Sequence, residues 1–359
     1  MQFALCHEAH CPPGTPHHQR YQEMVIEAVA AEQAGFDVYG VSEQHFLPEV
    51  ATSAAPEGIM NVVASKTEHI RLRFMSAVIS VNHPIRIIER LNTLDAMSDG
   101  RAELGLARSN NPLTLAAFGV RADETRTRLN EGLPIIFRAL TEKVFSADGD
   151  IWQIPESAVV PLPVQQPHPP VYISATSDET HALAARIGIG CMSGNTVLGW
   201  DYLDNNVQRY RSGIGDAEPL GAFVTNSVGT FAATVACAPT MEEAMADGEA
   251  VALAFMDTVM GFYVRLADSS PGYEYLGQIA DLKEHAEDIP FLMEFNPYFH
   301  IGTPEFLIER FKRLEAMGLN ELILRIDGMG HERNMATIEM IGEHVIPHFQ
   351  RSMTPRTDR

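Results

Sequence analysis

Hydroxyl and cationic side chains follow two of the short apolar runs in the sequence. Arg108 comes directly after one run, and Thr176, Ser177 and Thr180 come after another. The second group precedes a predicted helix, and the free amides and hydroxyls at a helix N-terminus bind phosphate well. These residues predict a cradle for a phosphate-bearing cofactor, with Arg108 as the matching cation. Ordinary helix capping explains the same hydroxyl residues equally well, so that interpretation stays open.

A possible acid–base group, Glu43, Gln44 and His45, follows a third apolar run. Histidine side chains in general change protonation near neutral pH, so His45 is a candidate general acid or base, with Glu43 orienting its ring. A hydrogen-bonded histidine with a purely structural role explains the pattern equally well.

Other chemistries have weaker support. Histidine and cysteine are the usual zinc ligands, and six of them lie near the N-terminus: Cys6, His7, His10, Cys11, His17 and His18. They are local in sequence and surround a Pro-Pro-Gly loop, whereas a barrel metal site draws ligands from several strand ends, so we predict no metal. The sequence has no Gly-x-Ser-x-Gly motif, which disfavours a serine hydrolase.

The elements that must position these groups alternate between short apolar runs and longer amphipathic stretches, which is typical of parallel βα units. Eight runs qualify as strands: Gln2 to Cys6, Asp37 to Ser42, Ile70 to Ser80, Arg101 to Ala107, Pro170 to Ala175, Gly188 to Met192, Ala222 to Val235 and Glu321 to Ile326. We predict an α/β fold with a single (β/α)8 TIM barrel domain over residues 1–359. Such barrels form their active sites at the C-terminal ends of the strands, where the polar groups above lie.

Helical spacing and capping signals predict helices over Gln19 to Ala34, from Pro84 onward, from Thr303-Pro304 onward and over about 334–349. Two stretches fall outside this scheme and are predicted as insertion loops. Residues 148–170 contain six prolines and should form extended chain before the fifth strand. Residues 268–297 should form a long excursion near the last strands, with the character of a lid.

Composition narrows the function and the compartment. The 47 acidic residues outnumber the 26 basic ones and give a formal net charge of −21, which would repel nucleic acid and anionic membranes. The four cysteines lack the spacing of a disulfide framework, and no stretch of about 18 apolar residues is present. We expect a cytoplasmic protein that binds neither nucleic acid nor membrane.

Several motifs in this order resemble the bacterial luciferase-like flavin-dependent monooxygenases over most of the chain. The similar stretches are Ala31 to Asp37, Ser42 to Phe46, His83 to Arg86, Leu94 to Arg101, Glu103 to Arg108, Pro169 to Ala175 and Gly302 to Glu305. The His-Pro-x-Arg motif followed by Leu-Asp-x-Met-Ser-x-Gly-Arg is the most specific part.

The resemblance implies a two-component enzyme, usually dimeric, that receives reduced FMN from a separate NAD(P)H:flavin reductase. It would use O2, through a flavin C4a-(hydro)peroxide, to oxygenate a small organic substrate. Flavin phosphate contacts are implied for Arg108, Ser177 and Thr180, with Ala175 and Thr176 beside them. A cis peptide beneath the flavin ring is implied at Met75-Ser76 or Ser76-Ala77. His7 and Asn82 are expected to help shape the pocket.

The sequence departs from the family pattern at three places. Gln44 replaces the histidine that serves catalysis in light-emitting members, and an amide cannot act as a base. Ala107 replaces the usual reactive thiol, and Ser109 replaces the usual glycine. We therefore do not expect light emission. We expect another oxygenation reaction, such as hydroxylation, Baeyer–Villiger insertion or N-oxidation. Two alternatives stay open: an enzyme of the same barrel family that transfers hydride with the deazaflavin F420, and a non-catalytic flavin-binding subunit.

Overall fold

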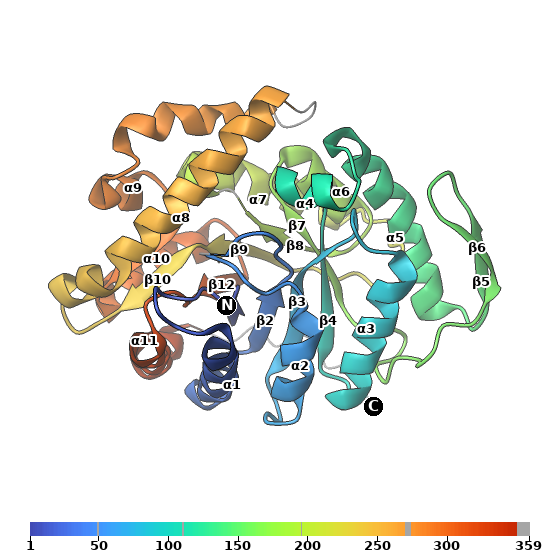
Figure 1. Ribbon diagram of the computed structural model, residues 1–359, viewed down its shortest axis with the longest axis horizontal. Helices are drawn as coiled ribbons and strands as arrows, with labels where there is room; N and C mark the ends of the chain where they lie inside the picture. The colour runs from blue at the N-terminus through green and yellow to red at the C-terminus, as the bar shows by residue number, and fades with distance from the viewer. Residues whose placement is uncertain (49, 110, 195, 270–273, 350–359) are drawn as a thin grey trace.

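Eight parallel strands close into a barrel, which confirms the predicted fold class. The computed structural model describes residues 1–349 except 49, 110, 195 and 270–273. The barrel closes in the order β1-β2-β3-β4-β7-β8-β9-β12 (Figure 1). Its strands are β1 (Gln2–His7), β2 (Val38–Ser42), β3 (Arg71–Val78), β4 (Ala102–Ala107), β7 (Val171–Ala175), β8 (Gly190–Ser193), β9 (Val228–Ala232) and β12 (Glu321–Arg325).

Helices surround the barrel. They are α1 (His17–Ala34), α2 (Pro56–Ala64), α3 (Pro84–Met97), α4 (Pro112–Ala117), α5 (Thr125–Thr141), α6 (Asp178–Arg186), α7 (Trp200–Ile214), α8 (Met241–Ser269), α9 (Ile289–Phe295), α10 (Pro304–Ala316) and α11 (His331–His344). The predicted signals act as expected at several ends: Gly35 ends α1 with a φ of 88°, and Thr303 caps α10. No helix in the described part of the chain combines the length and apolarity that a membrane crossing requires.

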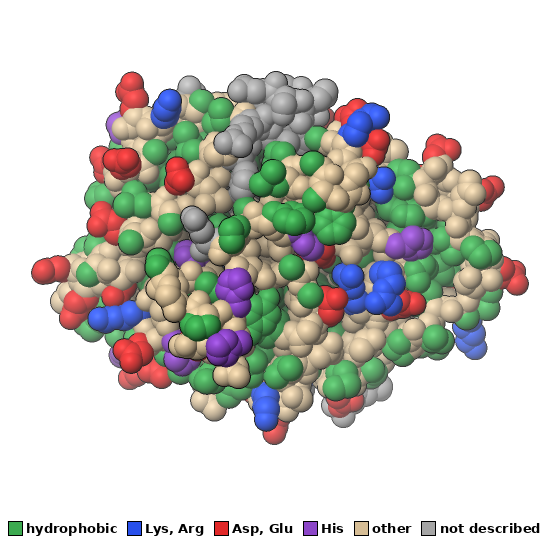
Figure 2. All heavy atoms as spheres, in the orientation of Figure 1, with side chains coloured by type: hydrophobic (Ala, Val, Ile, Leu, Met, Phe, Trp, Pro, Cys, Tyr) green, Lys and Arg blue, Asp and Glu red, His purple; other side chains and the backbone are tan. Residues whose placement is uncertain are grey.

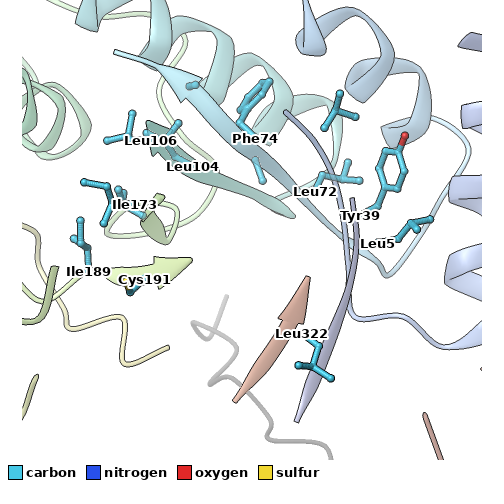
Figure 3. Close-up of a cluster of buried hydrophobic side chains, with 14 of the residues drawn as sticks. Leu5, Tyr39, Leu72, Phe74, Leu104, Leu106, Ile173, Ile189, Cys191 and Leu322 are labelled. Atoms are coloured by element: carbon cyan, nitrogen blue, oxygen red, sulfur yellow. The ribbon is translucent and has the colours of Figure 1, made fainter. Parts of the chain in front are cut away.

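The core lies on both sides of the barrel wall. Outward-facing strand side chains such as Leu72, Leu104 and Ile173 are buried beneath the helices (Figure 3). Inside the barrel, the buried Arg73 forms ion pairs with Glu103 at 2.6 Å and with Glu321 at 2.8 Å. Buried charges need this pairing, because an isolated charge in the interior is costly.

The cis peptide expected in β3 is absent from the described residues: the cis bonds there are Val160-Pro161 and Gln166-Pro167. A bulge stands in its place, where the pairing of β3 with β4 shifts between Phe74 and Ala77. Successive side chains of a regular strand point to opposite faces, and a bulge breaks that alternation. As a result Met75 and Ser76 both line the cavity described below, although they are neighbours in sequence.

Three predicted segments need correction. The seventh strand is shorter than 222–235: after β9, residues 234–237 form β10 (Thr234–Cys237), which leaves the barrel and pairs with β11 (Phe299–Gly302). The predicted loop over 148–170 contains β6 (Gln153–Ser157), which pairs with β5 (Phe145–Asp148) as an antiparallel hairpin.

The segment 268–297 is largely helical where it is described. The end of α8, a 3-10 helix (η3, Glu274–His285) and α9 occupy it, while residues 270–273 lie outside the described part of the chain. Figure 1 shows α8 and α9 together on one side of the barrel, away from the hairpin of β5 and β6. The chain here buries its own apolar cluster, including Met256, Ile279 and Leu292. That cluster explains why a stretch rich in turn-forming residues adopts helices.

Candidate active site

A cavity opens at the C-terminal ends of the barrel strands and encloses about 1380 Å³ of space, its open mouth included. Residues from every barrel strand or from the segment that follows it contribute to its wall. They include Cys6, Glu8, Glu43, Gln44, His45, Met75, Ser76, Ala107, Arg108, Ser109, Thr176, Met192, Gly194, Phe231, Phe255, Tyr298 and Ile323. Arg108 and Thr176 of the predicted cradle therefore line the same cavity as the acid–base group, whereas Ser177 and Thr180 are buried outside its wall.

The predicted cradle assembles around the N-terminus of α6. Arg108 and Thr176 line the cavity, and Ser177 is the residue before the helix. The side chain of Ser177 makes no capping hydrogen bond; its hydroxyl lies 3.1 Å from that of Thr180. The capping interpretation therefore does not account for the Ser177 hydroxyl. The amides of Glu179 and Thr180 already donate, to Asp178 Oδ1 at 2.8 Å and to the Ser177 carbonyl oxygen at 3.1 Å, so the cradle depends on side chains more than on helix amides.

His181 supports this helix start from behind. Its Nδ1 donates to the carbonyl oxygen of Ser177 at 2.8 Å, which leaves Nε2 to accept from the hydroxyl of Ser193 at 2.8 Å. That arrangement needs the neutral imidazole, because a protonated ring has no acceptor. Burial lowers the pKa of His181 to about 4.

The neutral His181 predicts a loss of stability in acid. The unfolded chain takes up a proton near pH 6.5, whereas the folded chain resists it until about pH 4. The free energy of unfolding should therefore fall as pH drops through this window, by at most about 3 kcal/mol from this residue. Urea denaturation at several pH values measures it. The His181→Gln variant should have a shallower slope between pH 6.5 and pH 4, and an unchanged slope would contradict the assignment.

Sequence reasoning missed a second cation at the same helix. Arg126 of α5 forms an ion pair with Glu179, in the first turn of α6, at 2.8 Å. The distance in sequence between α5 and α6 concealed this proximity. Arg108 and Arg126 thus offer two guanidinium groups to the region around the cradle, and arginine is well suited to phosphate oxygens.

His45 and Glu43 form a hydrogen-bonded pair, as predicted from their spacing. Nε2 of His45 lies 3.0 Å from Oε1 of Glu43, so the carboxylate holds the proton on Nε2 and leaves Nδ1 for a ligand. Glu43 is buried and also accepts from Asn82 Nδ2 at 2.8 Å and from the Val78 amide at 3.2 Å. Asn82 therefore acts through Glu43, although it does not itself line the cavity wall.

The mouth beside His45 is apolar. The ring of His45 packs against Phe118 with centroids 5.1 Å apart, and Phe46 lies 6.4 Å from Phe118. Phe46, Leu113 and Phe118 are all about half exposed. Figure 2 shows hydrophobic side chains gathered around α4 on this face of the molecule.

Asn111 connects α4 to His45. Its Oδ1 caps the helix by accepting from Leu113 at 2.9 Å, and its Nδ2 donates to the His45 carbonyl at 2.9 Å. We expect Asn111→Ala to lower the free energy of unfolding by about 1 kcal/mol, measured by urea denaturation. It should also perturb flavin oxidation, because the His45 backbone loses an anchor. Thr303→Ala, which removes the cap of α10 outside the cavity, should cost a similar stability and leave oxidation unchanged; equal oxidation behaviour of the two variants would contradict the link.

Some predicted residues lie elsewhere. Ala77 faces α3 and Ala175 is fully buried, so neither side chain lines the cavity, although Ser76 does. His7 does not shape the pocket: its Nε2 lies 3.0 Å from the buried Glu27 and its Nδ1 lies 3.2 Å from Tyr39. These contacts belong to a polar network that joins β1 to α1.

The other N-terminal histidines and cysteines that could have formed a metal site contact different parts of the protein. His10 contacts Arg325 at 3.1 Å, and Cys11 lies 3.7 Å from Thr52. No group of three or more possible metal ligands occurs within the residues that the structure describes.

The departures at Ala107 and Ser109 fall inside the cavity. Ser109 has a φ of 73°, a left-handed conformation that glycine adopts more readily. The backbone thus keeps the glycine-like shape while adding a hydroxyl, which accepts from the Asn111 amide at 3.2 Å.

The residues fit the phosphate and ring of a flavin. The cradle supplies Arg108 and Thr176 on the cavity wall, beside the start of α6, for a phosphate. Met75, Ala107 and Met192 give the adjoining wall an apolar surface for a planar ring. At Gly105 a Cβ would lie 2.4 Å from the Phe74 carbonyl oxygen, so glycine lets β4 pack closely against the β3 bulge that forms part of this wall.

Comparisons with known proteins identify the family of the chain. The model of the luciferase-like monooxygenase family matches residues 1–321. The oxygenase component of a flavin-dependent trigonelline monooxygenase from Acinetobacter baylyi is 27% identical over 94% of this chain and 92% of that protein. An uncharacterised protein of Sinorhizobium fredii, y4wF, is 32% identical, but the match spans about half of each chain, 47% of this one and 49% of that one.

Solved structures share the fold and differ in cofactor. The oxygenating constituent of 3,6-diketocamphane monooxygenase from Pseudomonas putida, in complex with FMN, has a TM-score of 0.74 at 19% identity, covering 98% of this chain and 99% of that one. The coenzyme F420-dependent tetrahydromethanopterin reductase of Methanopyrus kandleri has a TM-score of 0.71 at 17% identity, covering 97% and 99%. The same barrel therefore occurs with either cofactor. On the family match over residues 1–321, the chain belongs to the luciferase-like monooxygenases.

Proposed function

We propose that this protein is the oxygenase component of a two-component monooxygenase, which binds reduced FMN from a separate NAD(P)H:flavin reductase and oxygenates a small organic substrate with O2. One observation carries the proposal: Arg108 and Thr176 of the cradle line the same cavity as the His45–Glu43 pair. Full-length similarity to the oxygenase component of a flavin-dependent monooxygenase supports it. That relative's substrate, trigonelline, is not assigned to this chain.

Each part of the cavity has a role in this mechanism. Arg108 and Thr176 would hold the phosphate, with Ser177 and Thr180 at the adjoining start of α6 and Arg126 as a further cation. Reduced FMN, when bound, supplies the electrons that activate O2 for transfer of one oxygen atom. His45 presents Nδ1 to the reacting oxygen or substrate, because Glu43 fixes the other nitrogen. The apolar wall excludes water, which limits unproductive release of hydrogen peroxide.

The proposal includes a homodimer and a cytoplasmic location, both taken from the family resemblance and the cysteine content. The four cysteines are free thiols, as a reducing compartment allows.

An anaerobic titration with photoreduced FMN, followed by rapid mixing with O2, tests the proposal. We expect saturable binding and then reoxidation that is slower than that of free reduced FMN, with a transient absorbance unlike either flavin redox state. Binding of reduced FMN with reoxidation as fast as in solution would indicate a non-catalytic subunit. Binding of reduced F420 in preference to FMN would indicate hydride transfer instead.

A further inference from the structure

We propose that the cavity contains a substrate compartment, formed by Glu8, Gln44, Phe231, Phe255 and Tyr298, that binds an aromatic ring bearing a hydrogen-bond donor or positive charge, with Glu8 as the recognising acceptor. All five residues line the cavity. Glu8 follows β1, whereas the cradle follows β4 and β7, which lie across the barrel from β1. The assignment of this ring as a substrate rests on the proposed monooxygenase function; the binding itself does not.

The carboxylate of Glu8, not its partner cation, faces the cavity. Arg325 approaches Glu8 Oε2 to 3.0 Å, but its side chain is 0% exposed against 8% for Glu8, and only Glu8 of the two lines the cavity. The guanidinium also donates to the carbonyl oxygens of Ala233 at 3.0 Å and Val50 at 3.2 Å. Arg325 is therefore bonded to other protein groups and lies behind the carboxylate of Glu8, away from the cavity.

Glu8 retains capacity to accept. Gln44 donates to Oε1 at 3.0 Å, and Arg325 contacts Oε2, so among the described residues each oxygen has one partner where a carboxylate oxygen can accept two. Through this contact the amide of Gln44 holds the carboxylate of Glu8 in place. Burial raises the pKa of Glu8, and Arg325 opposes that shift.

Aromatic rings form the walls beside Glu8. Phe231 lies 6.4 Å from both Phe255 and Tyr298, and Phe255 lies 5.7 Å from Tyr298, centroid to centroid. Phe231, at the end of β9, is only partly buried, because its ring borders the cavity. Aromatic walls favour a planar ligand and, where the ligand is positive, add cation–π attraction.

The charges on the cavity wall determine which polar group the ring of the ligand can carry. Among the acids and bases on the cavity wall, Glu8 and Glu43 are acidic, Arg108 belongs to the phosphate cradle and His45 is paired with Glu43. An anionic substituent in the compartment would meet the carboxylate of Glu8 in surroundings of low polarity, which is unfavourable. An amine, a ring N–H or a hydroxyl would instead donate to Glu8.

Three probes with one ring test this inference: benzylamine, which is cationic at pH 7, benzyl alcohol and benzoate. Their dissociation constants for the flavin-free, full-length protein can be measured by ligand-observed NMR. Benzylamine and benzyl alcohol should each bind at least about tenfold more tightly than benzoate. Benzoate binding as tightly as benzylamine would overturn the proposal.

Two variants distinguish the effect of the Glu8 acceptor on ligand binding from the effect of the aromatic walls. Glu8→Gln should shrink the preference for benzylamine over benzoate to less than about threefold, because the charge is gone and the shape is kept. Phe231→Leu should weaken benzylamine and benzyl alcohol alike and keep the preference. An unchanged preference in folded Glu8→Gln would overturn the role of Glu8. If Glu8→Gln does not fold, the order of the three dissociation constants in the wild type and in Phe231→Leu still tests the proposal.

The result is independent of flavin chemistry, because no flavin is present. If the ranking holds while reduced FMN fails to bind, the compartment stands and the oxygenase proposal falls. If reduced FMN binds and reacts as proposed while benzoate binds best, the compartment alone is rejected.

Discussion

Arg108→Ala should raise the dissociation constant of reduced FMN by about 10²-fold. Arg108 lines the cavity together with Thr176, which stands two residues before α6, and a phosphate would sit there. One or two charge-assisted hydrogen bonds between guanidinium and phosphate, each contributing about 1.5–3 kcal/mol, account for a change of this size. Anaerobic titration with reduced FMN, followed by absorbance, measures it.

Arg86→Ala is the matched control. Arg86 lies on α3 with its side chain 63% exposed and paired with Glu89, and its loss changes the net charge by the same amount. FMN affinity in this variant should stay within about twofold of the wild type, because exposed charges are screened by salt. An Arg108→Ala variant that binds FMN as tightly as Arg86→Ala would reject the cradle.

The barrel could be predicted because its signals are local. Alternating apolar runs and capping residues located all eight barrel strands, mostly to within one or two residues. The predicted strand bounds were wrong where tertiary packing determines the path of the chain. β9 and β10 are separated by a single residue and read as one strand, yet β10 leaves the barrel to pair with β11, some 60 residues later in the chain. No sequence pattern distinguished those two destinations.

The site was predicted in part for the same reason. His45, Glu43, Arg108 and Thr176 stand at strand ends, and the fold alone brings strand ends together. Glu8 was missed because its partner Arg325 lies more than 300 positions away in sequence. The bulge in β3 was missed because it depends on room left by neighbouring strands, which includes Gly105 on β4.

His45→Ala should accelerate release of hydrogen peroxide from the complex of protein and reduced FMN, without substrate, by about 10- to 100-fold. The variant loses Nδ1, the ring nitrogen that Glu43 leaves for a ligand. In the variant the group that donates to Nδ1 is left unsatisfied in the cavity, which costs about 1–3 kcal/mol and corresponds to that range of rates. Rapid mixing with O2, combined with a peroxide assay, measures the rate, and affinity for FMN should change by less than about threefold.

Glu43 must act through His45 if the pair is the functional unit. Glu43→Gln keeps the shape of the side chain but weakens the hold on Nε2, so it should accelerate peroxide release less than His45→Ala does. In the double variant the effects should not add, because the two residues share one hydrogen bond. His69→Ala, on a side chain that is 79% exposed, controls for the loss of a histidine. Full additivity, or an unchanged rate in His45→Ala, would show that the pair only supports the fold and would move the search for the oxygen-stabilising group to Ser109 and Ser76.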